Sequence, residues 1–69
     1  MTERERCEKN GWTVGTRLVE DDGSGPTEIE ITAIGAENIL AREVAHNGIR
    51  CRMIERPWNL GVRDWKRVE

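Results

Sequence analysis

The chain has 69 residues, of which 36% are hydrophobic and 35% are charged. A domain of this length buries only about 60% of the surface that its unfolded chain exposes, so each large apolar side chain matters for stability. Nothing in the sequence approaches the roughly 18 apolar residues of a membrane-spanning helix, and the N-terminus has no apolar signal-peptide core. The sequence therefore predicts a small soluble domain, which we expect in the cytoplasm.

The net charge of −2 conceals two parts of opposite sign. Residues 1–40 contain four basic and nine acidic residues, whereas residues 41–69 contain seven basic and four acidic residues. Such charges either pair with each other inside a small domain or bias which partners approach each face. The two cysteines, Cys7 and Cys51, lack the close spacing of a metal site, so we expect no bound metal or cofactor.

Residues 1–10 alternate acidic and basic side chains and lack an apolar stripe. A segment without apolar side chains cannot bury enough surface to hold a fixed position. We therefore predict a charged flexible tail at residues 1–10, or at most a short exposed helix, and a single folded domain at residues 11–69.

The first predicted strand covers residues 13–20 and places Val14 and Leu18 on its buried face. A cluster of turn-forming residues at 21–26 separates it from the next strand. Residues 27–34 alternate strictly between apolar and polar side chains, which is the period-2 pattern of an antiparallel strand with one buried face. These two segments predict the first hairpin of a sheet.

A third strand is predicted at residues 38–46, with an imperfect alternation that either a β-bulge or a strand covered on both faces would explain. A helix over residues 36–45 is the alternative, because Ala, Leu, Glu and Arg are good helix formers. Asn47-Gly48 is the strongest turn signal in the chain, since a type I′ turn needs positive φ at both positions. It leads into a fourth strand at residues 49–55. The predicted buried face of that strand carries Ile49, Cys51 and Met53.

Pro57 ends the fourth predicted strand, residues 58–61 predict a single 3₁₀ turn, and residues 64–68 predict a short last strand. This order is similar to the architecture of the SH3-like small barrels, including the Tudor and KOW groups. The resemblance covers residues 12–68 and implies an all-β fold, a small barrel of five antiparallel strands with a flexible N-terminal tail. The paired tyrosines of a true SH3 groove are absent, because the chain contains no tyrosine.

Three local stretches carry a second resemblance. The stretches "GWTVGTRL", "ITAIGAENILAR" and "VRDWKRV" resemble small uncharacterised proteins encoded by phages of actinobacteria. The resemblance implies the host cytoplasm during infection as the setting, and it implies no mechanism.

Enzymatic activity is not expected. His46 is the only histidine and lies beside a predicted hairpin tip, while Cys51 is predicted on the core face of a strand. A nucleophile and its base must share one pocket, and a barrel this small is filled by its own side chains. The acids of residues 20–25 are consecutive and do not match a calcium loop, whose ligands alternate.

The remaining candidate is a surface that combines tryptophan with arginine. We expect Trp65 and Trp12 to close the core, whereas Trp58, which follows Pro57, is expected to be partly exposed. Exposed tryptophan and arginine are enriched among the residues that dominate binding energy at interfaces. The predicted partner-binding residues are Trp58, Arg42, Arg50, Arg52, Arg56 and Arg63.

Three functional hypotheses follow. The first is a non-enzymatic interaction module that binds a protein partner or itself through this surface. The second is binding of single-stranded DNA or RNA, with arginines on phosphates and tryptophans stacked on bases. The third is a structural or assembly component of a virion. Cross-strand pairing of Glu28 or Glu30 with the arginines would explain the same residues without any ligand.

Overall fold

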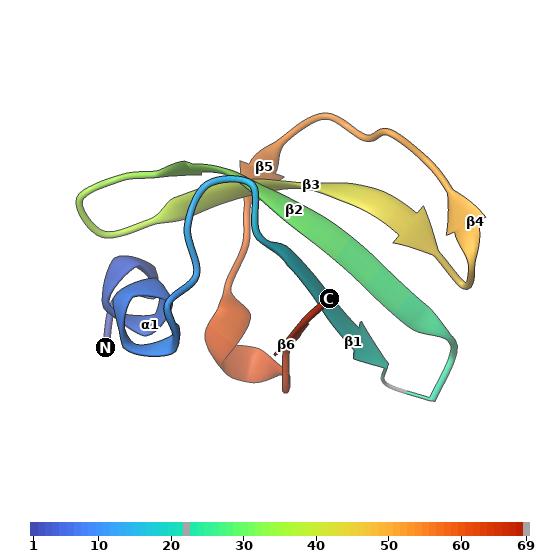
Figure 1. Cartoon of the computed structure of the whole chain (residues 1–69), viewed down its shortest axis with the longest axis horizontal. Coiled ribbons are helices and arrows are strands. Elements are labelled where there is room, and N and C mark those ends of the chain that lie inside the picture. The colour runs from blue at the N-terminus through green and yellow to red at the C-terminus, as the bar shows by residue number, and fades with distance from the viewer. Residues whose placement is uncertain (22, 69) are drawn as a thin grey trace.

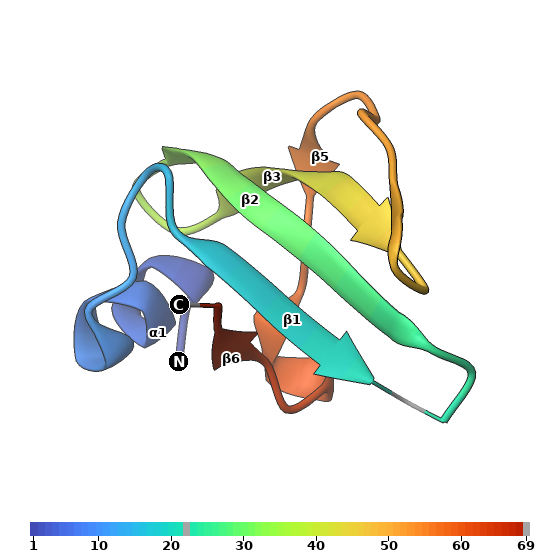
Figure 2. The same ribbon diagram turned by 45° about the vertical axis from the view of Figure 1, so that its right-hand side comes forward.

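The computed structural model describes residues 1–21 and 23–68. They form one short α-helix, a six-stranded antiparallel sheet and a 3₁₀ helix (Figures 1 and 2). The elements are α1 (Glu3–Asn10), β1 (Arg17–Asp21), β2 (Pro26–Ile34), β3 (Ile39–His46), β4 (Ile49–Arg50), β5 (Arg56–Pro57), η1 (Leu60–Val62, the 3₁₀ helix) and β6 (Lys66–Arg67).

The sheet is open. Its strand order is β4-β3-β2-β1-β6, and β5 also pairs with β3. Strands β4 and β5 follow one another along one edge of β3, while β6 forms the other edge of the sheet beside β1. The predicted mainly β, antiparallel fold is confirmed, and the closed five-stranded barrel is not, because no pairing among the described residues joins the two edges.

Strands β2 and β3 carry the core of the sheet. Ile29 and Ile31 have 0% exposure, as the alternation in β2 predicted. Residues Ile39–His46 form a strand, so the helical alternative is wrong. Asn47 and Gly48 have φ angles of 54° and 82°, which confirms that the predicted turn has positive φ at both positions.

Strand β3 contains the bulge that its imperfect alternation predicted. Glu28 pairs with Ala45, but the next residue, Ile29, pairs with Glu43, so Val44 has no partner on β2. An extra residue of this kind bends the strand and changes which face its neighbours occupy. Glu43 shares a face with Ile29 and Val44 contributes to the opposite face, as simple alternation gives, whereas the shift places the next residue, Ala45, opposite Glu28.

The strand after the turn is much shorter than predicted. Strand β4 contains only Ile49 and Arg50, although the backbone N–H groups of Cys51 and Met53 still donate to carbonyls of β3. Ile49 is 72% exposed and Met53 is 55% exposed, so the predicted buried face is wrong, and Cys51 is only half-buried. This segment is a sheet edge beside a bulged strand, where the regular register is lost.

Strand β1 begins later than predicted, at Arg17. Val14 lies in a turn before it, where Gly15 has a φ of 95°, and its side chain is 60% exposed rather than buried. Gly15 permits this bend because a residue with a Cβ adopts such a φ only at a cost. Leu18 is fully buried, as predicted.

The segment predicted as a flexible tail is helix α1. The Thr2 hydroxyl accepts the backbone N–H of Glu5 at 3.1 Å, and the Glu5 carboxylate accepts the backbone N–H of Thr2 at 2.8 Å. This reciprocal capping box satisfies two donors at the start of the helix. The hydrogen bond from the Thr2 backbone lowers the pKa of the Glu5 carboxyl. Gly11, with a φ of 72°, ends the helix.

Helix α1 is attached to the rest of the molecule through Cys7, Arg4 and Glu3. Cys7 is 1% exposed within the core, and its burial raises the pKa of the thiol. The Arg4 backbone N–H donates to the Glu37 carbonyl at 3.0 Å, and the Glu3 carboxylate accepts the Leu60 backbone N–H at 2.8 Å. The Cα radius of gyration of 11.2 Å matches the value of about 11 Å for a folded chain of this length, so the helix belongs to the compact body.

One face of the sheet is covered by α1, η1 and the C-terminal segment (Figures 1 and 2). We call it the covered face and the opposite one the open face. Trp65 is 7% exposed, which confirms its predicted place in the core, and Trp12 packs against the same core. The buried core consists of Cys7, Leu18, Ile29, Ile31, Ile39, Ala41, Leu60 and Trp65. No helix in the described part of the chain is long and apolar enough to cross a membrane.

Candidate interaction surface

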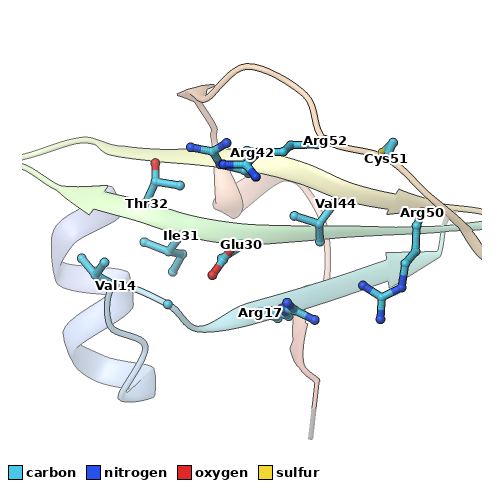
Figure 3. A pocket seen from close by; sticks show the side chains of 11 residues that line it. Val14, Arg17, Glu30, Ile31, Thr32, Arg42, Val44, Arg50, Cys51 and Arg52 are labelled. Atoms are coloured by element: carbon cyan, nitrogen blue, oxygen red, sulfur yellow. The ribbon is translucent and has the colours of Figure 1, made fainter.

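A groove of about 520 Å³ lies on the open face of the sheet (Figure 3). Its lining comes from the turn before β1, from β1, β2 and β3, and from the segment that follows the β3–β4 turn, so residues distant in sequence meet there. Val14 and Val44 contribute apolar surface between the charged side chains. We call it the basic groove after the four arginines that line it, which are Arg17, Arg42, Arg50 and Arg52.

The strand register places charges in a row across the groove. Arg17 of β1 lies opposite Glu30 of β2, and Glu30 lies opposite Arg42 of β3 (Figure 3). Residues directly opposite in an antiparallel pair share a face of the sheet. Arg17 also forms an ion pair with Glu28 at 3.8 Å, with 44% of its side chain exposed. An exposed pair of this length contributes little to stability.

The other three arginines of the groove lack such partners. Within residues 1–21 and 23–68, Arg42, Arg50 and Arg52 make no ion pair shorter than 4.0 Å and no side-chain hydrogen bond. Cross-strand pairing with Glu28 or Glu30 therefore does not account for these three side chains. Their guanidinium groups are left to solvent or to a ligand.

Apolar side chains are exposed along the same sheet edge. Met53 and Ile54 directly follow Arg52 and are 55% and 87% exposed. Ile49, the first residue of β4, lies opposite His46 and is 72% exposed. We call Ile49, Met53 and Ile54 the apolar edge.

Trp58 lies on the covered face, away from the basic groove. Its ring contacts that of Trp65 edge to face, with centroids 5.7 Å apart and planes at 89°. Its indole N–H donates to the Ala41 carbonyl at 3.0 Å, and the Arg56 guanidinium stacks over its ring at 4.1 Å from the centroid. Trp58 is thus half-buried, in agreement with the prediction that it is the partly exposed tryptophan of the pair.

A second pocket, of about 460 Å³, surrounds Trp58 and Trp65. Arg63 lines it and forms an ion pair at 2.9 Å with Glu20, which is 8% exposed. This pairing satisfies a buried carboxylate, so Arg63 has a structural reason to be where it is. His46 lines the same pocket, and its Nδ1 lies 3.1 Å from the Thr27 hydroxyl.

The structure therefore divides the six predicted site residues between two faces. Arg42, Arg50 and Arg52 line the basic groove, whereas Trp58, Arg56 and Arg63 line the pocket on the covered face. The structure does not bring the predicted Trp–Arg surface together: β4 and β5 pair with the same edge of β3, and the chain passes to the covered face only after β5, on its way to η1 (Figures 1 and 2).

Sequence reasoning missed three residues of this region. Arg17 could have been found, because strand alternation places it on the face opposite Leu18 and beside Glu30. Ile54 could also have been found, because alternation in residues 49–55 places it on the outward face with Arg50 and Arg52. Met53 had no such signal: alternation predicts it to be buried, and only the loss of regular pairing exposes it.

Comparison with protein families gives one match. The family model described as "Domain of unknown function (DUF7241)" matches residues 1–69. The chain belongs to this family. No curated protein and no solved structure is similar to it at a significant level. Because the description of the family states no activity, the function has to be argued from the surface itself.

Proposed function

We propose that the protein is a non-enzymatic interaction module that binds a partner protein through the open face and its edge. The observation that carries the proposal is the contiguity of unpaired arginines and exposed apolar side chains. Arg50 and Arg52 make no ion pair within the described residues, and Met53 and Ile54 follow them with more than half of each side chain exposed.

The composition of this surface matches that of protein interfaces. Methionine and arginine are enriched at such interfaces, and grouped exposed apolar side chains mark sites of association. A chain this short has few large apolar residues to bury. Three of them on one edge remain exposed, so their burial contributes nothing to the stability of the isolated domain. A partner that covers them would gain the free energy of burying that apolar surface.

The same geometry favours a protein partner over single-stranded nucleic acid. Base stacking needs an exposed aromatic beside the cations. Trp12, Trp58 and Trp65 all pack against the core on the covered face, and the chain contains no tyrosine or phenylalanine. Nucleic-acid binding remains the second hypothesis, supported by the three arginines that make no ion pair within residues 1–21 and 23–68.

Two other expectations stay predictions. They are the relation to SH3-like barrels and the origin in a phage of actinobacteria. The third functional hypothesis, a role in virion assembly, depends on that origin. The open antiparallel sheet with a 3₁₀ helix before its last strand is compatible with a distorted small barrel.

The test compares tagged wild-type protein with Met53→Ser/Ile54→Ser and with a matched control, Val62→Ser. Val62 is also apolar and 70% exposed, but it lies in η1 beside the covered-face pocket. Each protein is used to capture partners from lysate of the source host, with and without nuclease treatment. We expect the wild type and Val62→Ser to retain the same protein, and the double variant to lose it.

Three results would contradict this proposal. Loss of all bound material on nuclease treatment would move nucleic-acid binding to first place. Retention of the partner by the double variant would show that the apolar edge is not the contact. Recovery of the chain alone, as a stable oligomer by analytical ultracentrifugation, would replace the partner with a second copy.

A further inference from the structure

We propose that the basic groove receives an extended acidic segment of the partner protein, in which carboxylates alternate with small polar residues. This inference rests on the proposed function and specifies the chemistry of the partner. It is carried by the arrangement of charge on the open face, where four arginines and one carboxylate line the same groove.

Arginine is suited to such a ligand. Its planar guanidinium group presents paired N–H donors that match the two oxygens of a carboxylate. Arg42, Arg50 and Arg52 have all of these donors free of protein partners within the described residues. They lie along β3 and its edge, so an extended chain laid beside them meets successive cations.

The spacing of the groove fits an extended chain. Arg50 and Arg52 are two residues apart, which corresponds to about 6.6 Å along an extended backbone. An extended ligand has the same repeat, so carboxylates at every second position meet successive arginines. The residues between them point the other way and need no charge.

Glu30 makes the groove selective among anions. It lies between Arg17 and Arg42 in the register, and no ion pair shorter than 4.0 Å neutralises it within the described residues. A phosphodiester backbone carries a charge at every unit and would place one against this carboxylate. A peptide backbone is uncharged between its side chains and can present an amide N–H donor there instead. This contrast favours an acidic peptide over nucleic acid.

The probe is a synthetic peptide of alternating glutamate and serine with about six glutamates. It is titrated at low salt into the full-length protein labelled with ¹⁵N, and amide shifts are recorded. Comparison ligands are a lysine–serine peptide and oligothymidylate of equal charge number. We expect the acidic peptide to bind most tightly and to shift the amides of Arg42 and of residues 50–52.

The test variant is Arg50→Gln/Arg52→Gln, whose two side chains are exposed and unpaired in the described structure. The matched control is Lys9→Gln/Arg67→Gln, which removes the same charge from α1 and β6. We expect the test variant to weaken the peptide about tenfold and the control to change it less than about twofold, since exposed ion pairs contribute up to about 1 kcal/mol each. Affinity should also fall with added salt.

Failure of the acidic peptide to bind would overturn the inference, as would tighter binding of oligothymidylate. If the peptide fails while Met53→Ser/Ile54→Ser still loses its partner, the groove chemistry is wrong and the interaction module stands. If the peptide binds through Arg50 and Arg52 while the apolar-edge variant keeps its partner, the groove stands and the apolar edge is wrong.

Discussion

The two faces of this sheet differ in how their polar groups are satisfied. On the covered face, buried Glu20 pairs with Arg63 and the Trp58 indole donates to the Ala41 carbonyl. On the open face, the guanidinium groups of Arg42, Arg50 and Arg52 have no ion pair within the described residues. The contrast is confined to these groups: on the open face Arg17 does pair with Glu28, and on the covered face the buried Trp65 indole nitrogen has no hydrogen-bond partner among the described residues. Under the proposed function, folding and recognition would use different faces of the same strands.

The largest expected effect tests the covered face. Trp65→Ala removes the largest core side chain, and we expect a loss of about 3–5 kcal/mol in the free energy of unfolding, enough to unfold a small marginal domain. Urea denaturation followed by circular dichroism measures it. The open-face control is Ile54→Ala, which is 87% exposed in the wild type and should change stability by less than about 0.5 kcal/mol. If both variants lowered the free energy of unfolding equally, the covered face would not be the one that stabilises the fold.

A smaller effect is expected at Trp58, which is half-buried. Trp58→Ala loses the edge-to-face contact with Trp65 and the hydrogen bond to Ala41, and should cost about 2–3 kcal/mol. Trp58→Phe keeps an aromatic ring and loses the hydrogen bond, so it should cost about 1 kcal/mol. Thermal melts of both variants, with partner capture in parallel, distinguish a packing role of Trp58 from a role in binding the partner. Full stability of Trp58→Ala combined with lost binding would restore Trp58 as the recognition residue.

The smallest expected effect is a difference in reactivity between the two thiols, Cys7 in the core and Cys51 beside the basic groove. Cys7 lies in the core and its burial raises the pKa of the thiol, so little reactive thiolate forms near neutral pH. Cys51 is half-buried beside the basic groove. Brief iodoacetamide treatment of the native protein should therefore modify one thiol, located by peptide mass spectrometry, and Cys51→Ser should remove it.

Equal labelling of both thiols in the native state would show that helix α1 opens readily from the core. That outcome would support the prediction of a flexible tail at residues 1–10. Protection of Cys7 until the protein unfolds would support the docking seen at Glu3, Arg4 and Cys7.

Local sequence patterns determined the central part of the molecule. The alternation around Ile29 and Ile31 specifies a strand with one buried face, because side chains point to opposite faces with period 2. Asn47-Gly48 specifies the turn, because both residues adopt positive φ at low cost. Trp65 had to be buried because a chain with so few aromatics has little else to fill its core.

Only the tertiary structure decided the rest. Helix α1 is held by one buried cysteine and by hydrogen bonds to residues more than 30 positions away, and such contacts leave no periodic pattern in the sequence. The bulge at Val44 and the early end of β4 exposed Met53. The separation of Trp58 from Arg42 depends on the path of the chain around the edge of β3. The alternation of apolar and polar residues determines which side chains share a face of one strand. The packing of segments distant in sequence determines which of these faces come together.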